Sequence, residues 1–77
     1  MRIVDSIPHE SMTISIFQMN DKFQVRFEAG MMEQTFKFTS GDVGGLEGLK
    51  KVIDENFISK TRARFNDMFM QLRDSLQ

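Results

Sequence analysis

Residues 22–39 read KFQVRFEAGMMEQTFKFT, and this stretch decides the fold. Apolar and polar residues alternate along both of its halves, which is the period of a β-strand with one buried face. Ala29-Gly30 lies between the halves and supplies the residue that tolerates a positive φ in a tight turn. The stretch therefore predicts two antiparallel strands joined by a hairpin. The residues expected to face inward are Phe23, Val25, Phe27, Met32, Gln34, Phe36 and Phe38.

The same pattern extends toward the N-terminus. Residues 12–19 alternate in the same way, and Asn20-Asp21 marks the tight turn that follows them. Three strands in meander order are therefore expected over residues 12–39. Residues 1–11 contain the only proline, Pro8, and are interpreted as an extended lead-in, which adds a fourth strand if it pairs with the meander.

The helical part begins where the period of two ends. Ser40 or Asp42 is expected to accept hydrogen bonds from the free amides of a first helical turn. The apolar residues beyond form two stripes whose centres lie roughly 120° apart at about 100° per residue, so one straight helix cannot press both onto one sheet. We expect a short helix, a bend near residues 55–57, and a longer helix from about Ile58 to Leu76. That helix would span roughly 28 Å, more than the roughly 23 Å of a seven-residue strand, so its last turn is expected to project past the sheet.

The expected fold class is therefore α+β, with all of residues 1–77 in one domain. A three-stranded or four-stranded antiparallel β-meander is followed by a helical segment over residues 42–76 that packs on one sheet face.

Chain length limits how this domain can be stabilised. Domains of this size bury only about 60% of their unfolded surface, and small ones usually add disulfides, a metal or oligomerisation. The 77 residues include no cysteine and one histidine, so self-association is the route that remains. A net charge of −1 and a pI near 5.7 argue against a general attraction to nucleic acid or anionic membranes. No secretory leader pattern or membrane-spanning stretch occurs, so the cytoplasm is the expected location.

The sequence contains no catalytic, cofactor-binding or metal-binding constellation. His9 stands beside a proline in an expected loop, and no serine lies in a G-x-S-x-G elbow. Asp54 and Glu55 diverge by about 100° on a helix rather than converging on a cation. The glycine-rich run at residues 40–45 lacks the lysine of a phosphate loop, and Asp42 would repel a phosphate. We therefore expect no enzyme activity, no cofactor and no metal.

An interaction surface is the first functional hypothesis. Seven methionines and eight phenylalanines give an adaptable apolar composition, which suits shared interfaces. Phe17 and Met19 are expected to point away from the core, and Ala63 and Met70 to lie on the far side of the longer helix. We interpret these four residues as a dimer or partner surface, with a symmetric homodimer as the expected assembly and an unidentified protein as the other partner.

Single-stranded nucleic acid is the alternative partner. Phe17, Lys22, Arg26 and Lys37 are expected on one polar sheet face, where an aromatic ring and basic groups can bind bases and phosphates. Glu28 and Glu33 also fall on this face, and pairs of opposite charge across strands explain the pattern as ordinary sheet stabilisation.

Three stretches carry a resemblance to known proteins. Ile7-Pro8-His9, residues 17–23 (FQMNDKF) and residues 27–37 (FEAGMMEQTFK) are similar to a family of small uncharacterised bacterial proteins, and this resemblance implies no activity. Strands followed by one long helix also resemble, in element order alone, the single-strand-binding folds of the Pur and Whirly kind, which pair such units into dimers. None of their sequence motifs is present, and a shared fold does not fix function.

Overall fold

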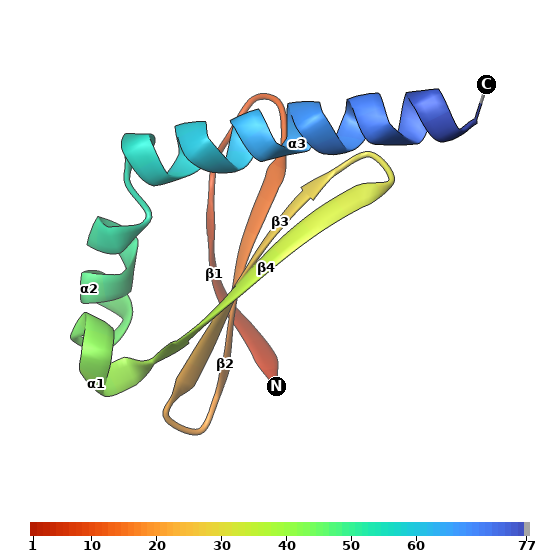
Figure 1. Cartoon of the computed structure of the whole chain (residues 1–77). Coiled ribbons are helices and arrows are strands. Elements are labelled where there is room, and N and C mark those ends of the chain that lie inside the picture. The colour runs from red at the N-terminus through yellow and green to blue at the C-terminus, as the bar shows by residue number, and fades with distance from the viewer. Residues whose placement is uncertain (77) are drawn as a thin grey trace.

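The computed structural model describes residues 1–76. Four strands form one antiparallel sheet in the order β1-β2-β3-β4, and three helices follow (Figure 1). The elements are β1 (Arg2–Ile7), β2 (Thr13–Met19), β3 (Lys22–Ala29), β4 (Met32–Thr39), α1 (Ser40–Val43), α2 (Gly45–Val52) and α3 (Glu55–Ser75). The predicted α+β meander followed by helices is confirmed, with the lead-in supplying the fourth strand.

Two tight turns set the register of the central strands. Asn20 and Gly30 adopt φ values of 57° and 60°, the left-handed conformation that asparagine and glycine tolerate best. Ile16 then lies opposite Val25, and Val25 opposite Phe36. These pairings align the inward-facing rows of neighbouring strands, as the alternation in the sequence predicts.

β1 departs from this regularity. Its register with β2 shifts between Ile3 and Asp5, so Val4 is the extra residue of a β-bulge. Asp5 is thereby paired with Ile16 and forms a salt bridge with Lys50 of α2. The strand that contains this bulge is the lead-in that was expected to add a fourth strand if it paired with the meander.

The core lies between the inner sheet face and the helices. Ile16, Val25 and Phe27 are fully buried, and Leu49 of α2 and Phe65 of α3 close over them. Aromatic contacts extend the core toward the edge of the sheet. The Phe57 ring centroid lies 5.9 Å from that of Phe27 and 5.0 Å from that of Phe36.

The helical segment breaks earlier than predicted. α3 begins at Glu55, after a break at Ile53 and Asp54, because the Asp54 carboxylate accepts a hydrogen bond of 2.9 Å from the Phe57 amide and so caps the helix. The predicted bend near residues 55–57 and the helix start near Ile58 were therefore slightly too late in the chain.

A second break divides the segment before α2. Gly44 and Gly45 adopt φ values of 78° and 77°, and these two left-handed residues separate the one-turn helix α1 from α2. The helical segment thus begins at Ser40, two residues before the expected boundary, and contains three helices rather than two.

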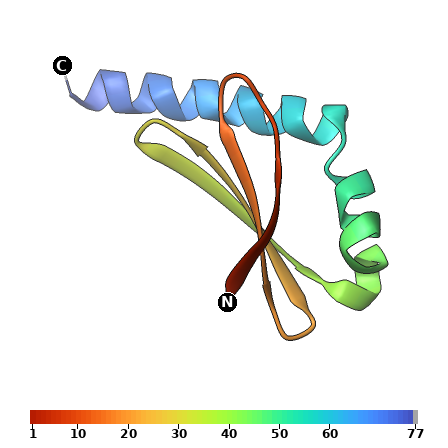
Figure 2. The same ribbon diagram turned by 180° about the vertical axis from the view of Figure 1, so that it is seen from behind.

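α3 is longer than the sheet it covers. It crosses the strand ends, passes over the β3–β4 hairpin and continues beyond it (Figures 1 and 2). The molecule is accordingly elongated, with principal extents of 44 × 24 × 20 Å. The predicted projection past the sheet is present, and it involves more of the helix than its last turn. No helix within residues 1–76 is both long and apolar enough to cross a membrane.

Candidate functional site

The apolar stripe of α3 is covered along only part of its length. Thr61 and Phe65 are 0% and 5% exposed where the sheet lies beneath them. Phe69 and Leu76, on the same side of the helix at spacings of four and eleven residues from Phe65, are 55% and 76% exposed. The sheet ends before the stripe does, so the second half of the helix presents apolar side chains without a covering layer.

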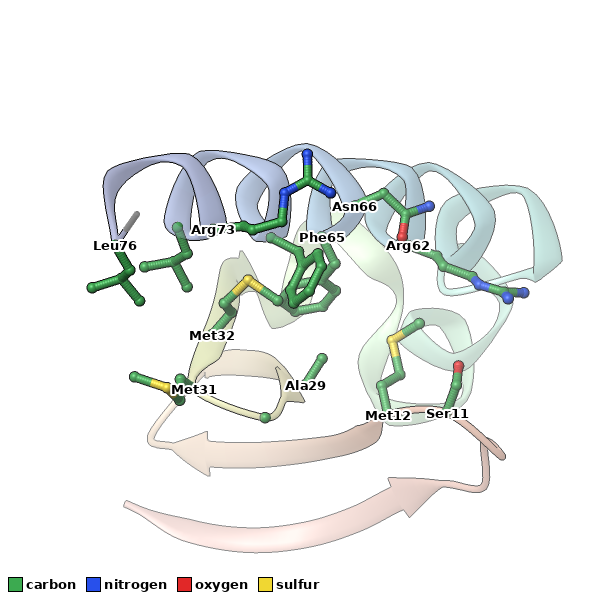
Figure 3. A pocket seen from close by; sticks show the side chains of 13 residues that line it. Ser11, Met12, Ala29, Met31, Met32, Arg62, Phe65, Asn66, Arg73 and Leu76 are labelled. Atoms are coloured by element: carbon green, nitrogen blue, oxygen red, sulfur yellow. The ribbon is translucent and has the colours of Figure 1, made fainter.

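Beneath this uncovered half lies a groove of about 780 Å³ (Figure 3). Its floor comes from the end of the β1–β2 connection and from the β3–β4 hairpin, and its roof from α3. Met12 and Met32 extend toward the helix near Phe65, while Met31 at the hairpin is 88% exposed. We name this space the α3 groove and define it by its apolar lining of Met12, Ala29, Met31, Met32, Phe65, Phe69, Leu72 and Leu76.

The polar groups of the α3 groove are basic or neutral. Arg62, Asn66 and Arg73 lie along one flank of α3 and belong to the lining of the groove, and Figure 3 shows the Arg73 guanidinium extending across the helix. Arg73 Nη2 lies 3.6 Å from Asp74 Oδ1, an exposed pair that constrains the side chain weakly. No carboxylate of residues 1–76 belongs to the lining. The groove therefore combines an apolar interior with two basic residues of α3 in its lining.

A smaller cleft of about 400 Å³ opens on the other flank of α3. Met31, Met32 and Glu33 line it from the hairpin, and Met68 and Leu72 line it from the helix. Leu72 and the two hairpin methionines border both spaces. Apolar surface is therefore accessible on both sides of the uncovered half of α3.

The covered half of α3 is fixed to the sheet by one hydrogen bond and carries a second within the helix. Gln34 Nε2 of β4 donates to the Thr61 carbonyl at 2.9 Å, and the Thr61 hydroxyl donates to the Phe57 carbonyl at 3.0 Å. Polar groups buried with their partners satisfied specify one arrangement, because an alternative packing would leave them unpaired. The covered half of α3 beside the α3 groove is therefore anchored to β4.

The predicted dimer residues lie on two separate surfaces. Ala63 and Met70 are exposed on α3, roughly 140–160° around the helix from Phe65 and hence away from the α3 groove. Phe17 and Met19 lie on the outer sheet face, where Phe17 is paired with Ile3 of β1. The structure does not bring the two pairs together. Sequence reasoning missed the groove, although the length of the stripe from Phe65 to Leu76 was its visible signal.

The alternative nucleic-acid residues do share the outer sheet face. The Arg26 guanidinium carbon lies 4.7 Å from the centroid of the Phe17 ring, a cation–π contact that occupies the ring face a base would stack on. Glu28 lies directly opposite Glu33 at one end of this face. These contacts make the face less suited to binding phosphates, and nucleic-acid binding stays a prediction.

His9 has a local structural contact. The Ser11 amide donates to His9 Nδ1 at 3.1 Å, which closes the turn between β1 and β2. Ser11 lines the α3 groove, whereas His9 does not. In the part of the chain that the structure describes, no group of three or more His, Cys, Asp or Glu side chains is placed to hold a metal.

One carboxyl group has a perturbed pKa. The hydrogen bond from Lys50 lowers the pKa of Asp5 below its ordinary value of 3.8, and the Ser6 amide, which donates to Asp5 Oδ1 at 2.8 Å, lowers it further. Asp5 lies at the β1 edge against α2, away from both apolar spaces. This shift therefore reports a structural salt bridge between strand and helix.

Comparisons of the chain with protein families, with curated protein sequences and with solved structures found no match. The resemblance to small bacterial proteins and the analogy with Pur and Whirly folds accordingly stay predictions.

Proposed function

We propose that this chain is a non-enzymatic protein-interaction module that works in the cytoplasm as a homodimer assembled through the α3 groove. One observation carries the proposal. Phe69 and Leu76 continue the stripe of the buried Phe65 yet remain more than half exposed above an apolar groove. Exposed apolar surface that is contiguous and rimmed by polar groups is typical of a partner site.

A second copy fits this site because the chain carries both halves of the contact. The projecting end of α3 is an apolar helix face, and the groove beneath it accepts such a face. In a twofold dimer the same patch serves on both subunits, so each projecting helix lies against the groove of the other. Burial of Phe69, Leu76 and Met31 then contributes up to roughly 1.5–3 kcal/mol for each side chain.

The test is a measurement of solution mass across a concentration series by light scattering or sedimentation. Phe69→Asp is expected to give a monomer, because it places a carboxylate in the apolar contact. Met70→Asp is the matched control: it makes the same charge change one residue later, about 100° around α3 and outside the lining of the α3 groove. Circular dichroism checks that both variants stay folded.

The same pair of variants separates the two dimer surfaces under consideration. If Met70→Asp dissociates the dimer and Phe69→Asp does not, the surface predicted from the sequence, with Ala63 and Met70, is the interface and the α3 groove is not. A wild-type chain that stays monomeric at high micromolar concentration contradicts the homodimer itself.

A further inference from the structure

The two edges of the sheet differ in how they are protected. Natural sheets disrupt exposed edges with bulges, prolines or charges, because an unpaired strand edge is a template for another chain. β1 has a bulge between Ile3 and Asp5 and is followed by Pro8. β4 is eight residues long, contains no proline and keeps an unbroken register with β3 from end to end. Its other edge is paired with no strand of residues 1–76.

The inner row of β4 is also incompletely covered. Met32, Phe36 and Phe38 are only half-buried, although they face the same core as the strand beside them. Phe27 and Phe23 on that neighbouring strand are 0% and 3% exposed. On the side of β4 that faces away from β3, no strand of residues 1–76 therefore covers this apolar row.

The outer row of β4 has a charge pattern that is complementary to itself. It reads Glu33, Thr35 and Lys37, and all three side chains are exposed. An antiparallel pairing of two such strands centred on Thr35 sets each glutamate opposite a lysine. Centring the pair on Glu33 or on Lys37 instead sets like charges opposite each other, which is unfavourable. Parallel pairing in register does the same.

From these observations we infer that two copies of the chain pair along β4, antiparallel about a twofold axis at Thr35, and form one continuous eight-stranded sheet. Glu33 of each subunit then faces Lys37 of the partner subunit, and Thr35 faces its own symmetry mate. The inference rests on the proposed function in taking a second copy as the partner, and it adds a second, separately testable contact.

The β4 edge adjoins the flank of α3 that carries the smaller cleft, not the flank that carries the α3 groove. The smaller cleft joins Glu33 at the start of β4 to Met68 and Leu72 of α3. The helix also continues beyond the β3–β4 hairpin (Figures 1 and 2). A second copy bound along β4 therefore adjoins the smaller cleft beside the uncovered half of α3.

A single introduced cysteine tests the register, because the chain has none of its own. Thr35→Cys is expected to form a disulfide-linked dimer on mild oxidation, visible on a non-reducing gel and lost on reduction. Thr39→Cys is the matched control, with the same residue type on the same strand and face. In the proposed register its symmetry mate lies about eight residues away, or roughly 27 Å. Equal crosslinking of the two variants, or none for Thr35→Cys in a chain that is dimeric by mass, overturns the inference.

A charge exchange tests the same contact without a covalent crosslink. Glu33→Lys and Lys37→Glu are each expected to raise the dimer Kd about threefold to tenfold, because each creates two like-charge pairs. The double variant Glu33→Lys with Lys37→Glu is expected to restore the Kd to within about twofold. Additive losses in the double variant contradict the pairing.

The outcomes distinguish this inference from the proposed function. Dissociation by Phe69→Asp without crosslinking at position 35 leaves the α3 groove as the interface and overturns the β4 pairing. Crosslinking at position 35 in a dimer that Phe69→Asp leaves intact supports the β4 pairing and overturns the groove. A wild-type chain that is monomeric at high micromolar concentration overturns both.

Discussion

The two halves of α3 carry the same kind of side chains but have different surroundings. In the first half Phe57, Thr61 and Phe65 lie over the sheet, and a hydrogen bond from Gln34 holds the helix in place. In the second half Phe69 lies above an open groove, and the helix continues past the hairpin. The difference shows that an apolar stripe marks what a helix can bury, whereas the extent of the sheet decides what it does bury.

The largest expected difference between the halves is in folding stability. Phe65→Ala removes a ring from the closed core and is expected to lower the free energy of unfolding by about 3–5 kcal/mol. Phe69→Ala removes the same ring one helical turn later and is expected to cost less than about 1 kcal/mol in the monomer. Urea denaturation at low protein concentration, where the monomer dominates, measures both. Equal losses would mean that the second half of α3 belongs to the core.

A smaller effect is expected at the anchor of the first half. Gln34→Ala leaves the Thr61 carbonyl without its side-chain donor, and we expect a loss of about 1–2 kcal/mol in unfolding free energy. Hydrogen exchange is expected to accelerate at amides near Thr61 more than in β2. Uniform acceleration across the sheet would show that the hydrogen bond does not act locally.

The start of the first half depends on one cap. Asp54→Ala removes the carboxylate that accepts from the Phe57 amide, with an expected cost of about 1 kcal/mol. Asp54→Asn keeps an acceptor oxygen and is expected to retain most of the stability. Thermal unfolding of the two variants provides the comparison, and equal losses would argue against the cap.

The smallest effect is expected outside α3, at the salt bridge that joins β1 to α2. Because the folded-state pKa of Asp5 is lowered, its contribution to stability is present above the ordinary value of 3.8 and is lost as the pH falls through the folded-state value. Asp5→Asn is expected to reduce the loss of stability on the acid side of that range. Unfolding curves between about pH 2 and pH 6 test this, and an unchanged pH profile would contradict it.

The sequence predicted those features that depend on local pattern. Alternation in residues 22–39 placed Phe23, Val25 and Phe27 correctly in the core, and it also placed Gln34 on the inner face. What it could not show was the partner of Gln34, since Thr61 is 27 residues away and meets it only after the helix folds back. The bend was placed too late because it was located from the apolar periodicity alone. The start of α3 is set instead by the Asp54 cap.

The candidate site was less predictable for a related reason. A groove between α3 and the hairpin depends on the crossing position of the helix, and no local pattern in either segment encodes that position. The expected interface residues were chosen because they were predicted to point away from the core. Met70 on α3 is exposed, as that prediction requires. The larger apolar surface arises from core-facing residues such as Phe69 that have no core beneath them.

The hydrogen bond between Gln34 and the Thr61 carbonyl has a consequence for how this domain can change. It anchors α3 at Thr61, before Phe65 in the chain. Folding therefore depends little on which side chains stand at Phe69, Leu72 and Leu76. Recognition can then diversify without loss of the scaffold. Two duplicated copies with complementary changes at these three positions could come to prefer each other over themselves, which would convert one self-pairing domain into an orthogonal heteromeric pair.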